Sequence, residues 1–294
     1  MTTGGNAAIE LTAVVVAVTG DEPKVLTVGD GVALPSGPFE SGHRTLQSGL
    51  REWVERQTHH PLGYMEQLYT FADRDRAAHT PADRVISISY LALAREVAAA
   101  SGAEWRDWYG FLPWEDWRNG EPRLIRASIL PRLLEWAGKS RARRQRVELA
   151  FQRWNEDLVL QRYELLFEAG LLPEAVPTNL ENPLPGVAMA QDHRRILATG
   201  IARLRAKIKY RPVVFELMPP SFTLLQLQRT MEALAGLRLH KQNFRRLIDQ
   251  QGLVEETGEV STETGGRPAR LVRFRREVLE ERAIGGTKLP LSRA

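Results

Sequence analysis

The sequence predicts an α+β protein, with a mixed sandwich of strands and helices first and a small helical module with a basic β-wing last. Strands are expected where apolar residues alternate or are β-branched, at 9–28, 64–72 and 85–92. A helix is expected between them at about 45–57. A long helical pattern fills 124–170, and two short helices precede two strand-like segments within 222–274.

The composition is that of a soluble globular protein of one large domain or two. The 294 residues are 43% hydrophobic and 26% charged. The absence of Cys excludes disulfides, thiolate zinc sites and a cysteine nucleophile, and it fits the cytoplasm. The apolar run Leu11–Val18 is too short to span a bilayer and follows Glu10, so it predicts a buried strand and no membrane contact.

The first part of the chain has the element order of a mixed α/β sandwich. Residues 9–28 predict two strands around a turn at Gly20-Asp21-Glu22-Pro23. A loop, the helix at 45–57, and strands at Tyr64–Ala72 and Val85–Ala92 follow. Six aromatic residues then crowd 105–117, which predicts a satellite core, with stacking on a base as the alternative.

The middle of the chain is predicted to be helical. Two apolar faces at helical spacing are formed by Ile125, Ile129 and Leu133 and by Phe151, Trp154 and Leu158. The charge run at 141–146 between them predicts a solvated loop or a helix start, and the Pro-rich segment 172–185 predicts a linker. Another helix is expected at about 190–207.

A helix start is clearly encoded at Thr223. Thr223 and Gln226 have the spacing of a capping box, and Phe222 with Leu227 has that of a hydrophobic staple. One face of this helix is predicted to be apolar through Leu224, Leu227, Met231 and Leu234. After a turn at Gly236, a second helix is expected from about His240 to Gln251, ended by Gly252.

The second helix and the segment after it have the chemistry of a DNA contact. Its inner side holds Phe244, Leu247 and Ile248, and its outer side holds Lys241, Gln242, Arg245 and Arg246. Strands at 253–260 and 271–274 flank a loop tip with Arg267 and Arg270. This order predicts a winged helix-turn-helix; the alternative is a helical domain that docks another protein.

The net charge of +4 lies in this last part of the chain. Residues 211–294 hold 14 Lys and Arg against 10 Asp and Glu, whereas the rest holds 26 of each. A basic module on a neutral body suits a nucleic-acid contact, although charge alone equally fits a solvated basic face.

Residues 37–59, GPFESGHRTLQSGLREWVERQTH, resemble the Nudix box of nucleotide-cleaving sites. Gly37, Arg51, Glu52, Trp53 and Glu55 stand where that pattern requires them. The pattern is broken at the first Glu position, the last Glu position and the closing pair, which hold His43, Arg56 and Thr58-His59. The alternative is a chance match in an amphipathic helix.

The broken box predicts binding without hydrolysis. Clustered carboxylates on this helix would hold Mg²⁺ against a diphosphate, and Mg²⁺ requires oxygen ligands. Arg56 replaces one carboxylate, lies one turn from Glu52, and is expected to pair with it. A guanidinium also contacts phosphate oxygens directly. We therefore predict no catalytic residue and no bound metal, with His43 as polar surface.

Both modules together resemble the Nudix-related transcriptional regulators of NAD metabolism, the NrtR type with its alphaproteobacterial NadQ-like relatives. The resemblance covers about 9–118 and 190–276 and rests on the box and on stretches such as YMEQLYTFADRDR, RVISISYLA, QDHRRI, KIKYRPVVFELMP and NFRRLIDQQGLVEETG. It implies a Nudix-like effector domain at 1–121, a helical insertion and linker at 122–189, a completing and connecting helix at 190–211, and the winged helix-turn-helix at 212–294.

The resemblance also implies a function, namely a homodimeric repressor of NAD biosynthesis or salvage genes. It would bind operator DNA and an effector, ADP-ribose or the related NAD or ATP, with no required cofactor and Mg²⁺ left open. The implied effector residues are Arg51, Glu52, Glu55, Arg56, Tyr69, Phe71, Arg74, Arg76 and Arg84. The implied DNA-binding residues are Thr223, Lys241, Gln242, Asn243, Arg245, Arg246, Arg267 and Arg270.

Two other functions stay open at this point. One is an active Mg²⁺-dependent hydrolase of nucleoside diphosphate derivatives that uses Glu52, Glu55 and a carboxylate from elsewhere. The other is a sugar-responsive regulator of the same architecture. The insertion at 122–187 is longer than the usual connection in such regulators, and the sequence assigns it no role.

Overall fold

The computed structural model describes residues 7–73, 84–95, 102–152, 154–175, 183–261, 268–275 and 277. Its centre is a mixed sheet in the order β4-β5-β1-β2-β6, with β3 also paired to β1. The strands are β1 (Ala7–Thr19), β2 (Glu22–Val28), β3 (Ser36–Pro38), β4 (Tyr64–Phe71), β5 (Arg84–Leu93) and β6 (Ala103–Asp107). β1 and β5 run parallel in the register Val14↔Leu91, and the other pairs are antiparallel.

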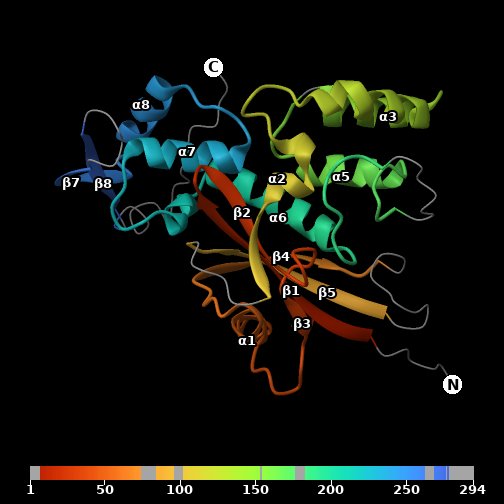
Figure 1. The fold of residues 1–294 in the computed structure, drawn as a ribbon, viewed down its shortest axis with the longest axis horizontal. Helices are drawn as coiled ribbons and strands as arrows, with labels where there is room; N and C mark the ends of the chain where they lie inside the picture. Colours follow the sequence, from red (N-terminus) through yellow and green to blue (C-terminus); the bar gives the residue numbers. More distant parts are fainter. Residues whose placement is uncertain are drawn as a thin grey trace.

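Helices cover both faces of this sheet (Figure 1). Alternate residues of β1 explain how: Leu11, Ala13 and Val15 pack with α1 (Leu46–Thr58), whereas Val14 and Val16 face α6 (His193–Ile208). α6 approaches β1 closely at Gly200, where an added Cβ would lie 2.9 Å from the Val14 side chain. The predicted mixed sandwich is confirmed.

The helical insertion lies beyond α6, on the face opposite α1 (Figure 1). It comprises a π-helix (Ile125–Ile129), α3 (Leu130–Ala137), α4 (Arg141–Val147), a second π-helix (Glu148–Gln152) and α5 (Val159–Glu168). The charge run at 141–146 is therefore a helix start, capped by Ser140. The predicted face through Phe151, Trp154 and Leu158 is wrong, because Trp154 and Leu158 lie between the second π-helix and α5.

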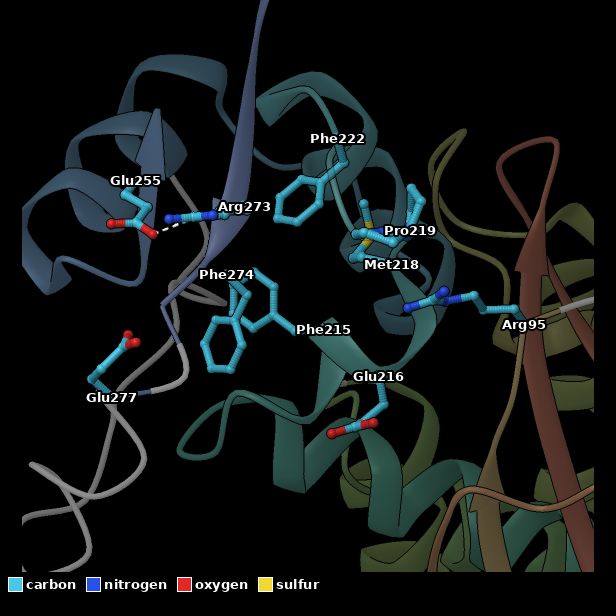
Figure 2. A pocket seen from close by; sticks show the side chains of 11 residues that line it. Arg95, Phe215, Glu216, Met218, Pro219, Phe222, Glu255, Arg273, Phe274 and Glu277 are labelled. Carbon is cyan, nitrogen blue, oxygen red and sulfur yellow. Dashed lines mark hydrogen bonds and ion pairs between the residues drawn. The ribbon is translucent and has the colours of Figure 1, made fainter. Parts of the chain in front are cut away.

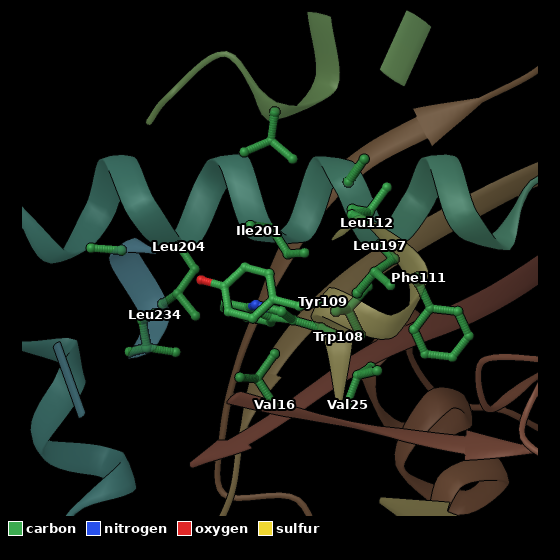
Figure 3. Packing of buried hydrophobic residues seen from close by; sticks show 14 of the residues in the cluster. Val16, Val25, Trp108, Tyr109, Phe111, Leu112, Leu197, Ile201, Leu204 and Leu234 are labelled. Atoms are coloured by element: carbon green, nitrogen blue, oxygen red, sulfur yellow. The ribbon is translucent and has the colours of Figure 1, made fainter. Parts of the chain in front are cut away.

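The aromatic residues of 105–117 do not form a satellite core. Trp108 and Trp114 are fully buried in the main cluster, beside α2 (Trp108–Phe111) and the short 3₁₀ helix Pro113–Glu115. Figure 3 shows Trp108 and Tyr109 between Val16 of the sheet and Ile201 of α6. Residues 108–114 are thus part of the main core, which their aromatic content alone did not reveal.

The C-terminal part has the predicted order of elements. After the 3₁₀ segment Val213–Leu217 come α7 (Leu224–Ala235), α8 (Lys241–Gln251), β7 (Val254–Ser261) and β8 (Ala269–Phe274), the last two paired antiparallel. The Thr223–Gln226 capping box is confirmed, and Gly236 and Gly252 end α7 and α8 in left-handed conformations. Phe222 and Leu227 are both buried, as the predicted staple requires.

One buried cluster runs from the sheet through the insertion to α7 and α8, and Leu234 of α7 belongs to it (Figure 3). The predicted unit boundaries at 121, 189 and 211 therefore stay a prediction. The Pro-rich segment has no helix or strand in its described residues, but Leu172 and Leu184 are buried, so it packs on the core. No helix among the described residues is both long and apolar enough to cross a bilayer.

Two strands and one turn differ from the prediction. β3 and β6 were not predicted, because Ser-Gly-Pro and Ala-Glu-Trp-Arg-Asp are too short and polar to show a strand pattern. The turn after β1 is only Gly20-Asp21, both with positive φ, and Glu22 and Pro23 already belong to β2. Two residues with positive φ are what a tight hairpin requires.

Candidate nucleotide site and nucleic-acid interface

The broken box forms a well-anchored loop and helix. Thr45 and Ser48 make a reciprocal capping box at the start of α1. The Trp53 indole donates to the Pro38 carbonyl at 2.9 Å and lies on Gly37, where an added Cβ would be 2.3 Å from the ring. The Gln57 amide bonds both backbone groups of Ser36 in β3. Gly37 is therefore required by packing as well as by the motif.

The residues at both substituted Glu positions contact the same carboxylate, that of Glu52. Arg56 donates to Glu52 Oε1, and His43 Nε2 lies 3.6 Å from Glu52 Oε2. His43 Nδ1 accepts a hydrogen bond from the Glu40 backbone at 3.0 Å, so the neutral ring carries its proton on Nε2, toward Glu52. The predicted Arg56–Glu52 pair is confirmed. His43 is not polar surface, since its side chain is only 4% exposed.

The other box residues take different positions. Arg51 donates to the carbonyls of Leu62 and Gly63 and so holds the segment before β4. Glu55 is exposed, one turn from Arg51. Among the described residues, no group of three or more His, Asp or Glu side chains is arranged to hold a metal ion. The helix therefore presents Glu52, neutralised by its neighbours, beside the exposed Glu55 carboxylate.

The predicted effector residues of β4 lie on the opposite face of the sheet. Phe71 is buried in the cluster under α6, with the Arg195 guanidinium 4.8 Å from its ring centre. Tyr69 is 58% exposed, and its ring centre is 5.0 Å from that of Phe71. The backbone of Arg84 pairs with Ala7 in the sheet. Arg74 and Arg76 lie outside the described residues. The structure does not join the α1 residues and Phe71 in one pocket, so their ligand roles stay predictions.

Phe71 instead lies beside the QDHRRI stretch, to which sequence reasoning gave no chemical role. It lines a small cavity together with Ser87 and with His193 at the start of α6. His193 Nδ1 accepts from the Leu34 backbone at 3.0 Å, and its buried Nε2 has no partner among the described residues. Arg195 is paired with Asp73 at 2.5 Å and with Asp192 at 3.1 Å. These contacts join the start of α6 to the end of β4 and to the segment before β3.

The burial of His193 predicts an acid-sensitive fold. Burial lowers the pKa of His193 from 6.5 to about 4. Between these values the unfolded chain binds a proton that the folded chain does not, so stability falls as pH drops through this window, by about 3 kcal/mol in full. His193→Asn keeps an acceptor for Leu34 and is expected to remove most of this slope. Urea midpoints between pH 7 and pH 4 measure it.

The control for this variant is His59→Asn, since His59 is exposed and in the left-handed conformation that Asn tolerates. An unchanged slope in His193→Asn would contradict the prediction.

A groove of about 530 Å³ lies between α7, α8 and the wing. It gathers four of the predicted DNA-binding residues, Thr223, Lys241, Arg245 and Arg270. The cations outnumber the single carboxylate, Glu256. Gln242, Asn243 and Arg246 are exposed on α8 outside this groove, and Thr223 is buried with its hydroxyl in the α7 cap. The groove has the charge that a phosphate backbone attracts.

The wing differs from the prediction in one respect. Arg270 is not at the loop tip but in β8, where it pairs with Glu256 of β7 at 2.5 Å. Both side chains are exposed, so the pair contributes little to stability and leaves Arg270 accessible. Arg267 lies outside the described residues.

The inner end of the wing packs on the segment that leads into α7. Phe274 of β8 stacks on Phe215 with 4.1 Å between ring centres. A cavity of about 410 Å³ is bordered by these two rings and Met218. Arg95, at the end of β5, faces this cavity from the side of the sheet (Figure 2). The segment 210–217, which leads from α6 toward α7, therefore contacts the wing directly.

Comparison with known proteins shows what the two parts of the chain resemble. Residues 214–274 match the family model of the NrtR DNA-binding winged helix domain. A curated relative, the ADPR responsive transcriptional repressor NtrR of Acinetobacter baylyi, is 44% identical over 86 residues, which are 29% of this chain and 34% of that protein. The chain is thus aligned to about a third of that relative.

Solved structures resemble the whole chain in fold. NrtR of Shewanella oneidensis, solved with a 27mer DNA, has a TM-score of 0.57 at 21% identity, covering 92% of this chain and 95% of that one. A MutT/nudix family protein of Enterococcus faecalis has a TM-score of 0.56 at 15% identity, covering 94% and 89%. The predicted α+β class with a Nudix-like sandwich is confirmed, and residues 214–274 match the NrtR DNA-binding winged helix domain.

Proposed function

We propose that this protein is a DNA-binding transcriptional repressor whose Nudix-like domain senses ADP-ribose. The observation that carries the proposal is the cationic groove between α7, α8 and the wing, in a domain that matches the NrtR winged helix. The relative from Acinetobacter is a repressor that responds to ADPR. The protein would act as a cytoplasmic homodimer on genes of NAD biosynthesis or salvage, with its two α8 helices on a palindromic site.

The Nudix-like domain is proposed to hold a nucleotide and not to cleave it. Glu52 is engaged by Arg56 and faced by His43, so its charge is already neutralised where a metal ion would need it. Mg²⁺ binds through several oxygen ligands, whereas Arg56 places a cation, and His43 an imidazole, at two of the carboxylate positions. The exposed Arg56 guanidinium can instead turn to a phosphate. NAD and ATP also contain linked phosphates and are kept as alternative effectors.

A titration of DNA binding tests the regulator. A duplex would first be selected from a random pool by the full-length protein. We expect ADP-ribose to weaken binding of this duplex by about 5- to 150-fold, the range of ordinary coupling between sites. Fluorescence anisotropy with ADP-ribose, NAD, ATP and a sugar panel measures the effect. Failure to select any duplex, or a response to sugars alone, would refute the proposal.

A turnover assay tests the rival hydrolase. The protein, ADP-ribose and Mg²⁺ are incubated and AMP is followed over time, with Glu55→Gln as the comparison. We expect no sustained turnover in either protein. Turnover by the unmodified protein that disappears in Glu55→Gln would show that the domain is a hydrolase. DNA binding would then still be decided by the anisotropy titration.

A further inference from the structure

We propose that the helical insertion sets the position of α7 through a buried ionic cluster, so that the packing of the insertion determines how tightly the DNA-binding module binds. The cluster consists of Tyr109, Glu115, Arg162 and Arg205, and below it is called the Glu115 cluster. The consequence for DNA affinity rests on the proposed function, whereas the mechanical link between α5 and α7 does not.

The first half of the link joins the insertion to Glu115. Arg162 of α5 donates to both oxygens of Glu115, at 2.6 and 2.7 Å, and both side chains are fully buried. The remaining guanidinium nitrogen donates to the carbonyls of Ala150 and Asn155, at 3.3 and 2.9 Å. A two-point contact fixes the direction of the guanidinium as well as its distance. Arg162 therefore moves with the insertion and carries Glu115 with it.

The second half joins Glu115 to the end of α7. Arg205 of α6 donates to Glu115 Oε2 at 2.7 Å and to the Leu234 carbonyl at 3.0 Å. The Tyr109 hydroxyl donates to the Ala233 carbonyl at 2.7 Å. The last carbonyls of a helix have no partners within it, so these two donors take the place of a cap. A cation at this end also complements the helix dipole.

The electrostatics favour one arrangement of the cluster. A single carboxylate is shared by two guanidinium groups, and all three are fully buried. Water does not reach these groups, so a broken ion pair would leave a buried charge without compensation. If α5 shifts, Glu115 and Arg205 are therefore expected to move with Arg162 and keep the ion pairs intact. Burial in a low dielectric therefore converts a movement of α5 into a movement at Leu234.

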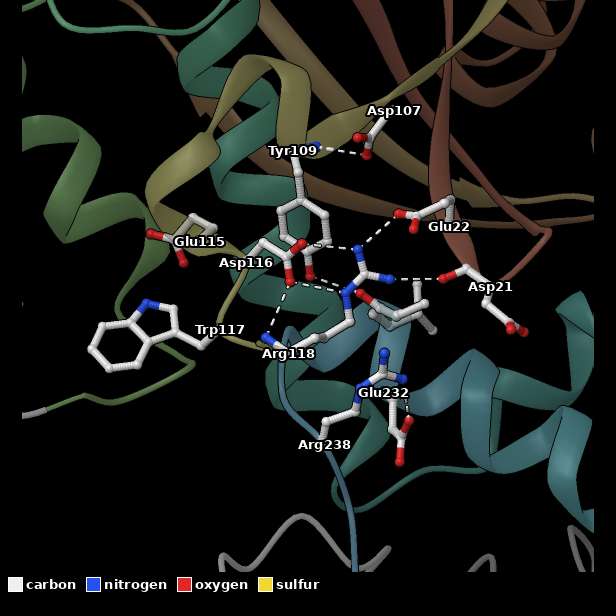
Figure 4. Close-up of polar contacts among 12 residues, drawn as sticks. Asp21, Glu22, Asp107, Tyr109, Glu115, Asp116, Trp117, Arg118, Glu232 and Arg238 are labelled. Atoms are coloured by element: carbon white, nitrogen blue, oxygen red, sulfur yellow. Dashed lines mark hydrogen bonds and ion pairs between the residues drawn. The ribbon is translucent and has the colours of Figure 1, made fainter. Parts of the chain in front are cut away.

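A second contact on the other side of α7 is weaker. Arg229 pairs with Asp21 in the β1–β2 turn at 2.9 Å, with both side chains about half exposed. Arg118 donates to the Asp21 carbonyl in this turn and to the Glu22 carboxylate at the start of β2, and it is also paired with Asp116 (Figure 4). Exposed ion pairs contribute little. The turn therefore contributes little to the position of α7, which is set mainly by the Glu115 cluster.

The experiment compares Arg162→Met with Arg146→Met in the full-length protein. Arg162→Met leaves a neutral Glu115–Arg205 pair, so the core is not left with an unpaired charge. Arg146→Met breaks an exposed pair with Glu168 elsewhere in the insertion and is the matched control. We expect hydrogen exchange of the amides of residues 230–237 to accelerate about tenfold in Arg162→Met and not in Arg146→Met.

Three further readouts separate positioning from loss of structure. Exchange in β1 and ADP-ribose affinity should be unchanged in Arg162→Met, whereas affinity for the selected duplex should change at least about threefold. Arg162→Lys keeps the charge without the two-point contact and should give an intermediate exchange rate. If Arg162→Met does not fold, Arg162→Lys decides.

Wild-type exchange at residues 230–237 in a folded Arg162 variant would overturn the inference. A wild-type protein that neither selects DNA nor responds to ADP-ribose would refute the proposed function instead. The exchange experiment would still decide the link between α5 and α7.

Discussion

Replacing both Arg245 and Arg246 by Ala is expected to reduce affinity for the selected duplex by roughly 100-fold, since each base or phosphate contact of an Arg is worth about 1–3 kcal/mol. Both side chains are exposed on α8, and Arg245 lines the groove beside Lys241. The fold and the ADP-ribose affinity should be unchanged, because neither side chain is part of the buried core. Anisotropy titrations at several salt concentrations provide the measurement.

The control is a double variant that removes two positive charges from the insertion instead of from α8. Arg126→Ala with Arg141→Ala also lowers the net charge by two, on the exposed surface of the insertion. It should reduce affinity only slightly. In the α8 variant the slope of log affinity against log salt should fall by about one for each phosphate that the protein no longer binds. Equal reductions of affinity in both variants would show that α8 is not the DNA-reading helix.

Gly236→Ala is expected to cause the largest loss of stability of any single substitution considered, roughly 2–5 kcal/mol from the combined costs of a left-handed Ala and an overpacked core. Gly236 has φ +70° at the end of α7. An added Cβ would lie 2.5 Å from the Glu115 carbonyl oxygen and 2.9 Å from the Tyr109 hydroxyl. The methyl group would thus push α7 away from the Glu115 cluster. Thermal unfolding measures the loss.

Gly252→Ala separates the two costs of that variant. Gly252 ends α8 with φ +56°, but its added Cβ would meet only the end of the Arg275 side chain, at 3.4 Å. It should therefore be destabilised by about 1–2 kcal/mol, the cost of a left-handed Ala alone. If Gly236→Ala is as stable as Gly252→Ala, α7 can move away from the Glu115 cluster without cost. That result would contradict both the close packing at Gly236 and the proposed link between α5 and α7.

The residues around the broken Nudix-like box were only partly predictable from the sequence. The spacing of Glu52 and Arg56 predicts their ion pair, because residues four apart on a helix are neighbours. The role of His43 was not predictable, since its approach to Glu52 depends on how the loop folds onto Gly49. The separation of Phe71 from α1 depends on which face of the sheet each strand residue takes, and the order of strands decides it.

What the sequence by itself determined about this protein is local. The capping box at Thr223, the glycine that ends α8 and the inner and outer faces of that helix all follow from contacts within one or two turns. Only the tertiary structure decided the rest, including the convergence of Lys241 and Arg270 on one groove and of Arg162 and Arg205 on Glu115. These residues are far apart in the chain, and the sequence shows no periodicity that relates them. The burial of apolar surface between elements brings them together, and in the Glu115 cluster the buried charges can be stabilised only by one another.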